Sequence, residues 1–204
     1  MRSLAKLATV FIAGLVLAAC NSGGAKGAGD EIGMGKADAP VKMIEYASAS
    51  CSHCARFATD VFPQFKAKYI DTGIVYYEMR EIITPPENFA AAAYLTARCV
   101  GPDKYYSVLD AVFRAQGSIF QSGDIVGGLR NIALSSGLSE DQWKKCVTDP
   151  EAQKALQARV ERYNREADIT GTPTFYFNGK MVKSGEMTMA ELDAAVTAAR
   201  AAKK

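Results

Sequence analysis

The chain has 204 residues, a formal net charge of +2 and 49% hydrophobic residues, which suits one globular α/β domain with a sizeable core. Its first 19 residues carry two of the 24 basic residues and none of the 22 acidic ones, so the remainder holds 22 of each. A neutral domain of this kind argues against nucleic acid as a partner.

The N-terminus has the pattern of a secretory signal peptide over residues 1–19. Arg2 and Lys6 precede an uncharged apolar run, residues 7–19, that is too short to span a bilayer comfortably. The sequence therefore predicts export from the cytoplasm.

The end of this apolar run, Leu17-Ala18-Ala19-Cys20, resembles the lipobox of bacterial lipoproteins, in which the cysteine is lipidated and becomes the mature N-terminus. An ordinary small-residue cleavage site beside an incidental cysteine is the alternative. Residues 21–36 contain six glycines and no aromatic residue, which is typical of a flexible chain. Residues 20–38 are thus expected to form a lipidated N-terminus and a flexible tether.

The motif Cys51-Ser52-His53-Cys54 stands where a strand-like run, residues 41–46, gives way to a helical one. Two thiols three positions apart in the first turn of a helix can close and reopen a disulfide with little backbone movement, and the helix dipole favours the first thiolate. Half of a zinc site and two buried thiols are the alternatives. A zinc site needs four ligands, but the single histidine, His53, lies inside the motif, while Cys99 and Cys146 stand alone. A redox pair is expected, with no metal and no cofactor.

Hydrophobic spacing predicts the elements on either side of this motif. The spacing indicates a strand over residues 41–47, a helix over residues 52–69 kinked at Pro63, and a second strand over residues 74–82. Several helices are expected to follow, over residues 87–99, 103–116, 122–136 and 139–164. The aromatic residues of this helical region are expected to pack in its core, and neither they nor Arg56 are given a binding role; they are Tyr105, Tyr106, Phe113 and Phe120.

Downstream, Gly171-Thr172-Pro173-Thr174 precedes two short apolar runs that are separated by Asn178-Gly179. Asn-Gly at such a place predicts a hairpin with a type I′ turn. A proline that enters a hairpin cannot donate to the ladder, so Pro173 belongs at a strand start or in a cis bond. Thr188 and Glu191 then form a capping box for a terminal helix.

In this order, the elements resemble the thioredoxin superfamily and, within it, the DsbA-like thiol:disulfide oxidoreductases of bacterial envelopes. The resemblance runs from about residue 39 to residue 199. It implies an α/β, thioredoxin-like fold with a mixed sheet flanked by helices. The catalytic domain would cover residues 39–204, with a helical subdomain, about residues 86–166, inserted between a βαβ unit and a ββα unit.

The resemblance also implies roles for single residues. Pro173 would be a cis-proline beside the dithiol, and the backbone at Thr172 and Pro173 would bind an extended substrate peptide. Glu45, six residues before Cys51, would be the buried carboxylate that assists proton transfer to and from Cys54. An imidazole between two active thiols cannot be deeply buried, and His53 is therefore expected to tune the Cys51 thiolate.

The activity expected from the resemblance is that of an oxidase on the periplasmic side of the bacterial envelope, anchored as a lipoprotein. Its substrates would be reduced or misoxidised exported proteins, and a quinone-linked membrane protein would reoxidise it. Ser52 departs from the proline usual in Cys-Pro-His-Cys, and Thr172 resembles isomerases and reductases. The alternatives are therefore a disulfide isomerase or reductase, and a redox-inactive, lipid-anchored binding module.

Two cysteines remain, Cys99 and Cys146, both in the helical region. Cys146 follows a predicted helix start at Ser139, which with Gln142 forms a capping box. In an oxidising compartment two leftover cysteines are expected to be bridged, and two buried inert thiols are the alternative.

Overall fold

The computed structural model describes residues 30–202. The expected signal peptide, residues 1–19, the expected lipidation site Cys20, and the first part of the expected tether lie outside the described residues. None of the helices within residues 30–202 combines the length and the apolar character that a membrane span requires.

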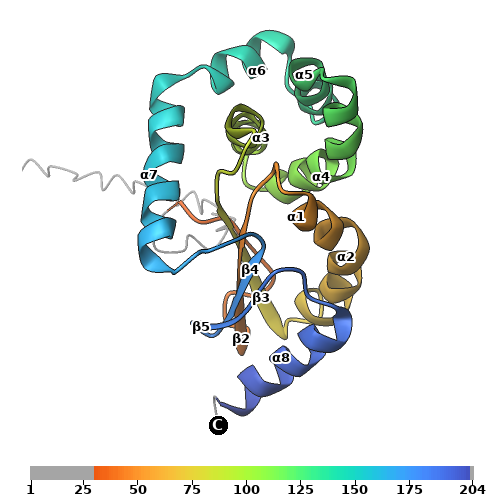
Figure 1. Cartoon of the computed structure of the whole chain (residues 1–204), viewed down its shortest axis with the longest axis vertical. Coiled ribbons are helices and arrows are strands. Elements are labelled where there is room, and N and C mark those ends of the chain that lie inside the picture. The colour runs from red at the N-terminus through yellow and green to blue at the C-terminus, as the bar shows by residue number, and fades with distance from the viewer. Residues whose placement is uncertain (1–29, 203–204) are drawn as a thin grey trace, which may run out of the picture.

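A five-stranded mixed sheet forms the centre of the domain (Figure 1). The sequence predicts the mixed sheet and four of these strands. Its strands lie in the order β1-β3-β2-β4-β5. β2 and β3 are parallel, and the other three pairs are antiparallel. The bounds are Gly33–Met34 for β1, Val41–Ala47 for β2, Val75–Glu81 for β3, Thr174–Phe177 for β4 and Lys180–Ser184 for β5.

Strand β1 lies in the segment that the sequence assigns to the tether. Gly33 pairs with Glu78 of β3, and a Cβ atom at Gly33 would fall 1.8 Å from the Tyr76 hydroxyl, so only glycine fits there. Glu31 also pairs with Arg162, and its side chain is 8% exposed. The ordered domain therefore starts before residue 39. A strand of two residues is too short to show alternation in the sequence. Its pairing with β3 holds it in place.

The helix after the active-site motif runs from Ser52 to Ile70, close to the predicted range. It consists of α1 (Ser52–Arg56), a π-helical segment η1 (Phe57–Val61), α2 (Phe62–Phe65) and a second π-helical segment η2 (Lys66–Ile70). Pro63 lies in the first turn of α2, where its missing N–H removes one helical hydrogen bond. The predicted irregularity at Pro63 thus takes the form of π turns on both sides of α2.

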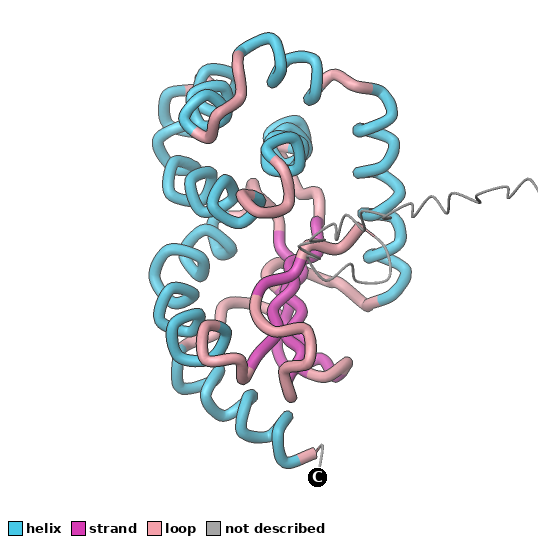
Figure 2. Tube along the Cα trace, turned by 180° about the vertical axis from the view of Figure 1, so that it is seen from behind, coloured by secondary structure: helices cyan, strands magenta, loops and turns pink. Residues whose placement is uncertain are grey.

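Five helices form the insertion between β3 and β4. They are α3 (Glu87–Val100), α4 (Tyr105–Ser122), α5 (Ile125–Ser135), α6 (Glu140–Val147) and α7 (Pro150–Glu166). Figure 1 shows α3 end-on, with α4 to α7 arranged around it as an arch, and Figure 2 shows from behind that the strands occupy the other half of the molecule. Tyr105 and Phe113 are buried, and Tyr106 and Phe120 pack against the same core, as predicted.

The prediction of one helix over residues 139–164 is wrong, because α6 ends at Val147 and α7 starts at Pro150. Proline cannot donate the N–H that a continuous helix would need, but it fits the first helical position. The Asp149 side chain caps α7 by accepting from the Glu151 N–H. The capping box of Ser139 and Gln142 at the start of α6 is confirmed.

A buried carboxylate joins the insertion to the sheet. Glu81, at the end of β3, is fully buried and accepts hydrogen bonds from Arg98 Nε (2.6 Å), Arg159 Nε (2.7 Å) and the Tyr105 hydroxyl (3.1 Å). These partners belong to α3, α7 and α4. One strand end therefore holds three helices of the insertion by charge-assisted hydrogen bonds.

The C-terminal unit follows the sequence closely. Asn178 and Gly179 both have positive φ, 47° and 80°, as the predicted type I′ turn between β4 and β5 requires. The terminal helix α8 (Met189–Ala201) begins with the predicted capping box of Thr188 and Glu191. This unit supplies the loops that face the Cys51 motif.

Candidate active site

Cys51 and Cys54 lie at the start of α1, directly after β2. Cys51 is the N-cap residue, and its Sγ accepts a hydrogen bond from the Cys54 N–H at 3.4 Å. Both are free thiols; Cys51 is partly exposed and Cys54 is fully buried. One sulfur is thus open to attack from solvent, while the other can be reached only through the first.

The surroundings of Cys51 favour its thiolate. Its pKa is lowered to about 5, because the Cys54 thiol, the Thr172 side chain and the N–H groups of Cys54 and His53 donate to the sulfur and outweigh its partial burial. A thiolate is the nucleophilic form of cysteine. The site therefore holds a reactive sulfur at neutral pH.

The loop before β4 lies against this sulfur. The peptide bond between Thr172 and Pro173 is cis, and the Cys51 thiol donates to the Thr172 carbonyl at 3.2 Å. The Gly185 N–H donates to the Pro173 carbonyl at 2.7 Å. Thr172 and Pro173 are thereby brought to the dithiol from 121 residues away, as the resemblance implies.

Glu45 lies on β2 and is buried, with 2% of its surface exposed. The Tyr77 hydroxyl donates to its Oε2 at 2.7 Å, yet burial still raises its pKa to about 8. The pKa of Cys54 is also raised, first by burial, then by its hydrogen bond to Cys51 and by the charge of Glu45. Glu45 thus carries a proton at neutral pH within electrostatic reach of the thiol that most strongly resists ionisation.

Helices of the insertion hold the turn between β2 and α1. Gln116 Nε2 on α4 donates to the carbonyl oxygens of Ala49 (2.7 Å) and Cys51 (3.3 Å). The Tyr94 hydroxyl on α3 donates to the Ala47 carbonyl at 2.6 Å. Neither residue could be predicted from the sequence, since a single glutamine or tyrosine in a helix forms no motif.

His53 is exposed and belongs to a charged cluster. Its Nδ1 lies 2.5 Å from Glu186 Oε1 and 2.6 Å from Arg56 Nη2, and Arg56 Nη2 donates to the same Glu186 oxygen at 2.5 Å. We call these three residues the His53 cluster. The sequence predicts no role for Arg56, and it carries no signal for Glu186, which lies 133 residues from His53.

A family model described as thioredoxin matches residues 28–198. The chain belongs to the thioredoxin family. Within it the structure is DsbA-like: it matches Wolbachia pipientis alpha-DsbA1 with a TM-score of 0.75 and 26% identity, over 86% of this chain and 93% of that one. It also shares the fold of Bacillus subtilis BdbD, with a TM-score of 0.74 and 24% identity, over 84% of this chain and 93% of that one.

Curated relatives carry related names. A putative protein-disulfide oxidoreductase of Rickettsia bellii is 30% identical over 147 residues, which are 72% of this chain and 56% of that protein. Disulfide bond formation protein D of Bacillus subtilis is 26% identical over 153 residues, which are 74% of this chain and 69% of that protein. The chain spans little more than half the length of the Rickettsia relatives it matches.

Cys99 on α3 and Cys146 on α6 form a disulfide with their Cα atoms 6.2 Å apart. The sequence leaves two alternatives open, a disulfide and two buried inert thiols, and the structure has the disulfide. The bond closes the arch of helices onto α3. Both of its cysteines are half-buried on helices of the insertion, and the bond is separate from the Cys51 dithiol.

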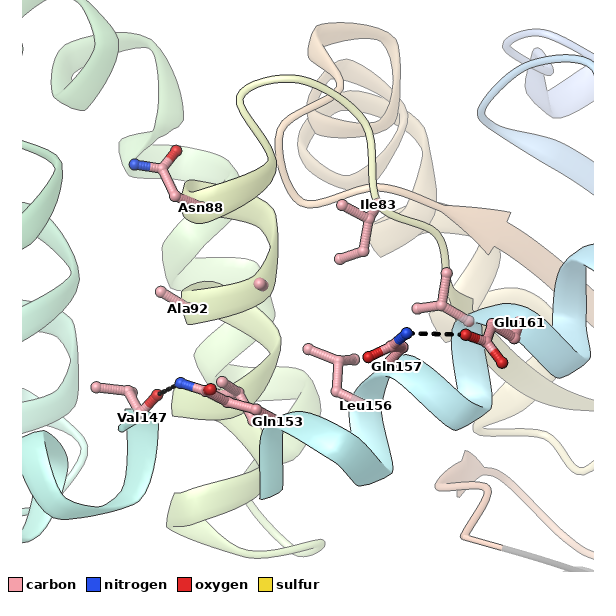
Figure 3. Close-up of a pocket in the computed structure, with 11 residues that line it drawn as sticks. Ile83, Asn88, Ala92, Val147, Gln153, Leu156, Gln157 and Glu161 are labelled. Atoms are coloured by element: carbon pink, nitrogen blue, oxygen red, sulfur yellow. Dashed lines mark hydrogen bonds between the residues drawn. The ribbon is translucent and has the colours of Figure 1, made fainter. Parts of the chain in front are cut away.

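Hollows also lie on parts of the surface that the sulfurs do not line. One, of about 620 Å³, separates α3 from α7 (Figure 3), and Glu161 is the one ionisable residue in its lining. Another, of about 430 Å³, extends from surface residues such as Asp103 and Arg114 to the buried Glu45. Among residues 30–202, no three side chains of the metal-binding types gather to hold an ion.

Proposed function

We propose that the chain is a thiol:disulfide oxidoreductase of the bacterial envelope, acting as a DsbA-like oxidase on exported proteins. The observation that carries the proposal is the contact of the Cys51 sulfur with the carbonyl of the cis Thr172–Pro173 peptide at 3.2 Å. It places a partly exposed, acidic sulfur beside a backbone loop that can hold an extended peptide. The names of the Rickettsia and Bacillus relatives, a putative protein-disulfide oxidoreductase and a disulfide bond formation protein, support the same activity.

The reaction is dithiol–disulfide exchange. In the oxidised enzyme, a substrate thiolate attacks Cys51 Sγ, and the bond between Cys51 and Cys54 breaks as the new mixed disulfide forms. The electron pair of the broken bond leaves on Cys54. A second substrate thiolate then attacks the substrate sulfur of the mixed disulfide and releases the Cys51 thiolate, so that the substrate is oxidised and the enzyme is reduced by two electrons.

Glu45 supplies the proton for the first of these steps. Burial raises the pKa of Cys54 well above its usual value, so its thiolate is a poor leaving group unless it is protonated. Glu45, with a pKa raised to about 8, holds a proton at neutral pH. The hollow that reaches Glu45 provides a path by which the carboxyl regains its proton from solvent.

The direction of the reaction follows from Cys51. Its lowered pKa means that the reduced enzyme is stabilised as a thiolate, and a stabilised reduced form makes the disulfide a stronger oxidant. Ser52 and Thr172 leave the charge at this sulfur unchanged. The charge effect therefore favours the oxidase over the isomerase or reductase.

The test uses purified, oxidised protein and a reduced, unfolded peptide with two cysteines. Wild-type protein should form the peptide's disulfide stoichiometrically, Cys51→Ser should abolish this and His53→Ala should slow it. A variant with both Cys99→Ala and Cys146→Ala is the matched control and should retain the transfer. If the wild type leaves the peptide reduced but reshuffles a scrambled disulfide protein, the isomerase replaces the oxidase.

The location and partners belong to the same proposal. The substrates are reduced or misoxidised exported proteins, and a quinone-linked membrane protein returns the dithiol to the disulfide. Cys20 carries a lipid that anchors the protein on the periplasmic side of the envelope. Cys20→Ser should give either unprocessed precursor or soluble mature protein, and membrane fractionation that recovers anchored, mature variant would contradict the lipid anchor.

A further inference from the structure

The His53 cluster joins the helix that carries the dithiol to the loop that holds the cis-proline segment. His53 and Arg56 lie on α1, one turn apart, on the surface beside Cys54. Glu186 lies in the loop between β5 and α8, next to Gly185, whose N–H donates to the Pro173 carbonyl at 2.7 Å. The same loop is anchored in the core by Met187, which is 2% exposed. Glu186 is thus held by its neighbours at a fixed place between the cis-proline loop and the active-site helix.

His53 Nδ1 has a hydrogen-bond partner in the cluster whether or not it carries a proton. The guanidinium group of arginine is always a donor, and an ionised carboxylate is always an acceptor. When His53 Nδ1 carries a proton, it donates to Glu186 Oε1 at 2.5 Å; when it does not, it accepts from Arg56 Nη2 at 2.6 Å. The ring therefore stays in one place in either state, with its other nitrogen uncommitted to these partners.

The charges of the cluster offset one another beside Cys51. Arg56 is positive throughout, and the pKa of Glu186 is lowered by the hydrogen bonds from Arg56 and His53, which outweigh its partial burial, so the carboxylate is ionised. Without Glu186, the positive charge of Arg56 would stand uncompensated at the start of α1. Positive charge there stabilises the Cys51 thiolate.

We propose that Glu186 is a positioning residue of the dithiol, whose carboxylate ties the His53 ring to the loop that holds the cis-proline segment and offsets the positive charge of Arg56 near Cys51. This inference deepens the proposed redox function and rests on it. On this view the pKa of Cys51 depends on two opposed charges, Arg56 on the active-site helix and Glu186 on a loop outside the motif.

The experiment measures the pKa of Cys51 in reduced protein by the ultraviolet absorbance of its thiolate. Glu186→Gln removes one negative charge that pairs with His53 and Arg56, so the net charge of the cluster rises by one. The amide keeps the size of the side chain. We expect the pKa of Cys51 to fall by about half a unit, the size of a partly exposed charge pair.

Two further variants make the test independent of any local disturbance. Arg56→Gln removes a positive charge from an exposed side chain and should shift the pKa of Cys51 upward. The double variant Arg56→Gln with Glu186→Gln should return it close to the wild-type value. Glu161→Gln, which removes the same charge from α7, is the control and should leave the pKa of Cys51 unchanged.

An unchanged or raised pKa of Cys51 in Glu186→Gln would overturn the inference, as would shifts of the same sign in Glu186→Gln and Arg56→Gln. These titrations need no protein substrate. If wild-type protein failed to oxidise a peptide, the proposed function would fall, while the opposed shifts of the two variants would still decide the role of Glu186.

Discussion

The Tyr77 hydroxyl donates to Glu45 Oε2 at 2.7 Å across two parallel strands, and both side chains are buried. The bond satisfies one carboxyl oxygen but does not offset the cost of burying a charge, and the pKa of Glu45 is raised to about 8. A carboxylic acid held in its neutral form can both accept from Tyr77 and donate its own proton.

This raised pKa predicts a loss of stability as pH rises. Between pH 4.5 and about 8 the unfolded chain releases the Glu45 proton while the folded protein keeps it, so the free energy of unfolding falls with pH over that window. The raised pKa of Glu45 corresponds to a loss of at most about 5 kcal/mol in the free energy of unfolding across this window. Urea unfolding of wild type and Glu45→Gln at both ends of the window should show a much shallower pH dependence for the variant, and equal slopes would contradict the prediction.

Cys51 titrates in the opposite sense. Its pKa is lowered to about 5 in the folded, reduced protein, so the stability it contributes is present above the ordinary thiol pKa and is lost as pH falls through 5. We expect a thiolate titration near pH 5 that survives in Cys54→Ala, shifted upward because no side chain at position 54 then donates to the sulfur, and disappears in Cys51→Ser. A midpoint near the ordinary thiol value in wild type would refute this.

The Cys99–Cys146 disulfide closes a loop of 47 residues. The chain-entropy model gives its stabilisation as about 4 kcal/mol, which is an upper guide for real bridges. Replacing both cysteines by alanine should lower the denaturant midpoint of unfolding while leaving the Cys51 titration in place. Mass mapping of oxidised wild type should find two disulfides, and an unaltered midpoint in the variant would show that the helices hold without the bond.

Glu81 anchors the insertion through buried charges. Glu81→Gln leaves Arg98 and Arg159 without their common carboxylate, which should cost about 3 to 5 kcal/mol of unfolding free energy. Glu161→Gln, which weakens only exposed pairs on α7, is the comparison and should cost well under 1 kcal/mol, or about zero. Similar losses in the two variants would contradict the role given to Glu81.

Local rules in the sequence predicted those elements whose geometry is set by neighbouring residues. The turn at Asn178 and Gly179 formed as expected because positive φ is a property of those two residues. Capping boxes at Ser139 and Thr188 formed because each needs only four consecutive residues. Pro150 carried an equally local signal for a break between helices, which the hydrophobic spacing obscured.

Features that depend on long-range contacts were out of reach. Strand β1 exists only because β3 lies beside it, and Glu186 meets His53 only after β4 and β5 have folded against β2. The resemblance supplied Glu45 and Pro173, whose places one sequence alone cannot show. No resemblance pointed to Gln116 or Glu81, since each works through partners on other elements.

Gln116 binds the Ala49 and Cys51 carbonyls from α4, a helix of the inserted subdomain, 65 residues beyond the dithiol. The insertion therefore helps to set the angle between β2 and α1. Sequence changes within α4 can alter how rigidly the two sulfurs are presented without touching the motif that contains them. Substitutions on this one helix, which carries neither sulfur, can for this reason change both the reactivity of the dithiol and the shape of the surface around it.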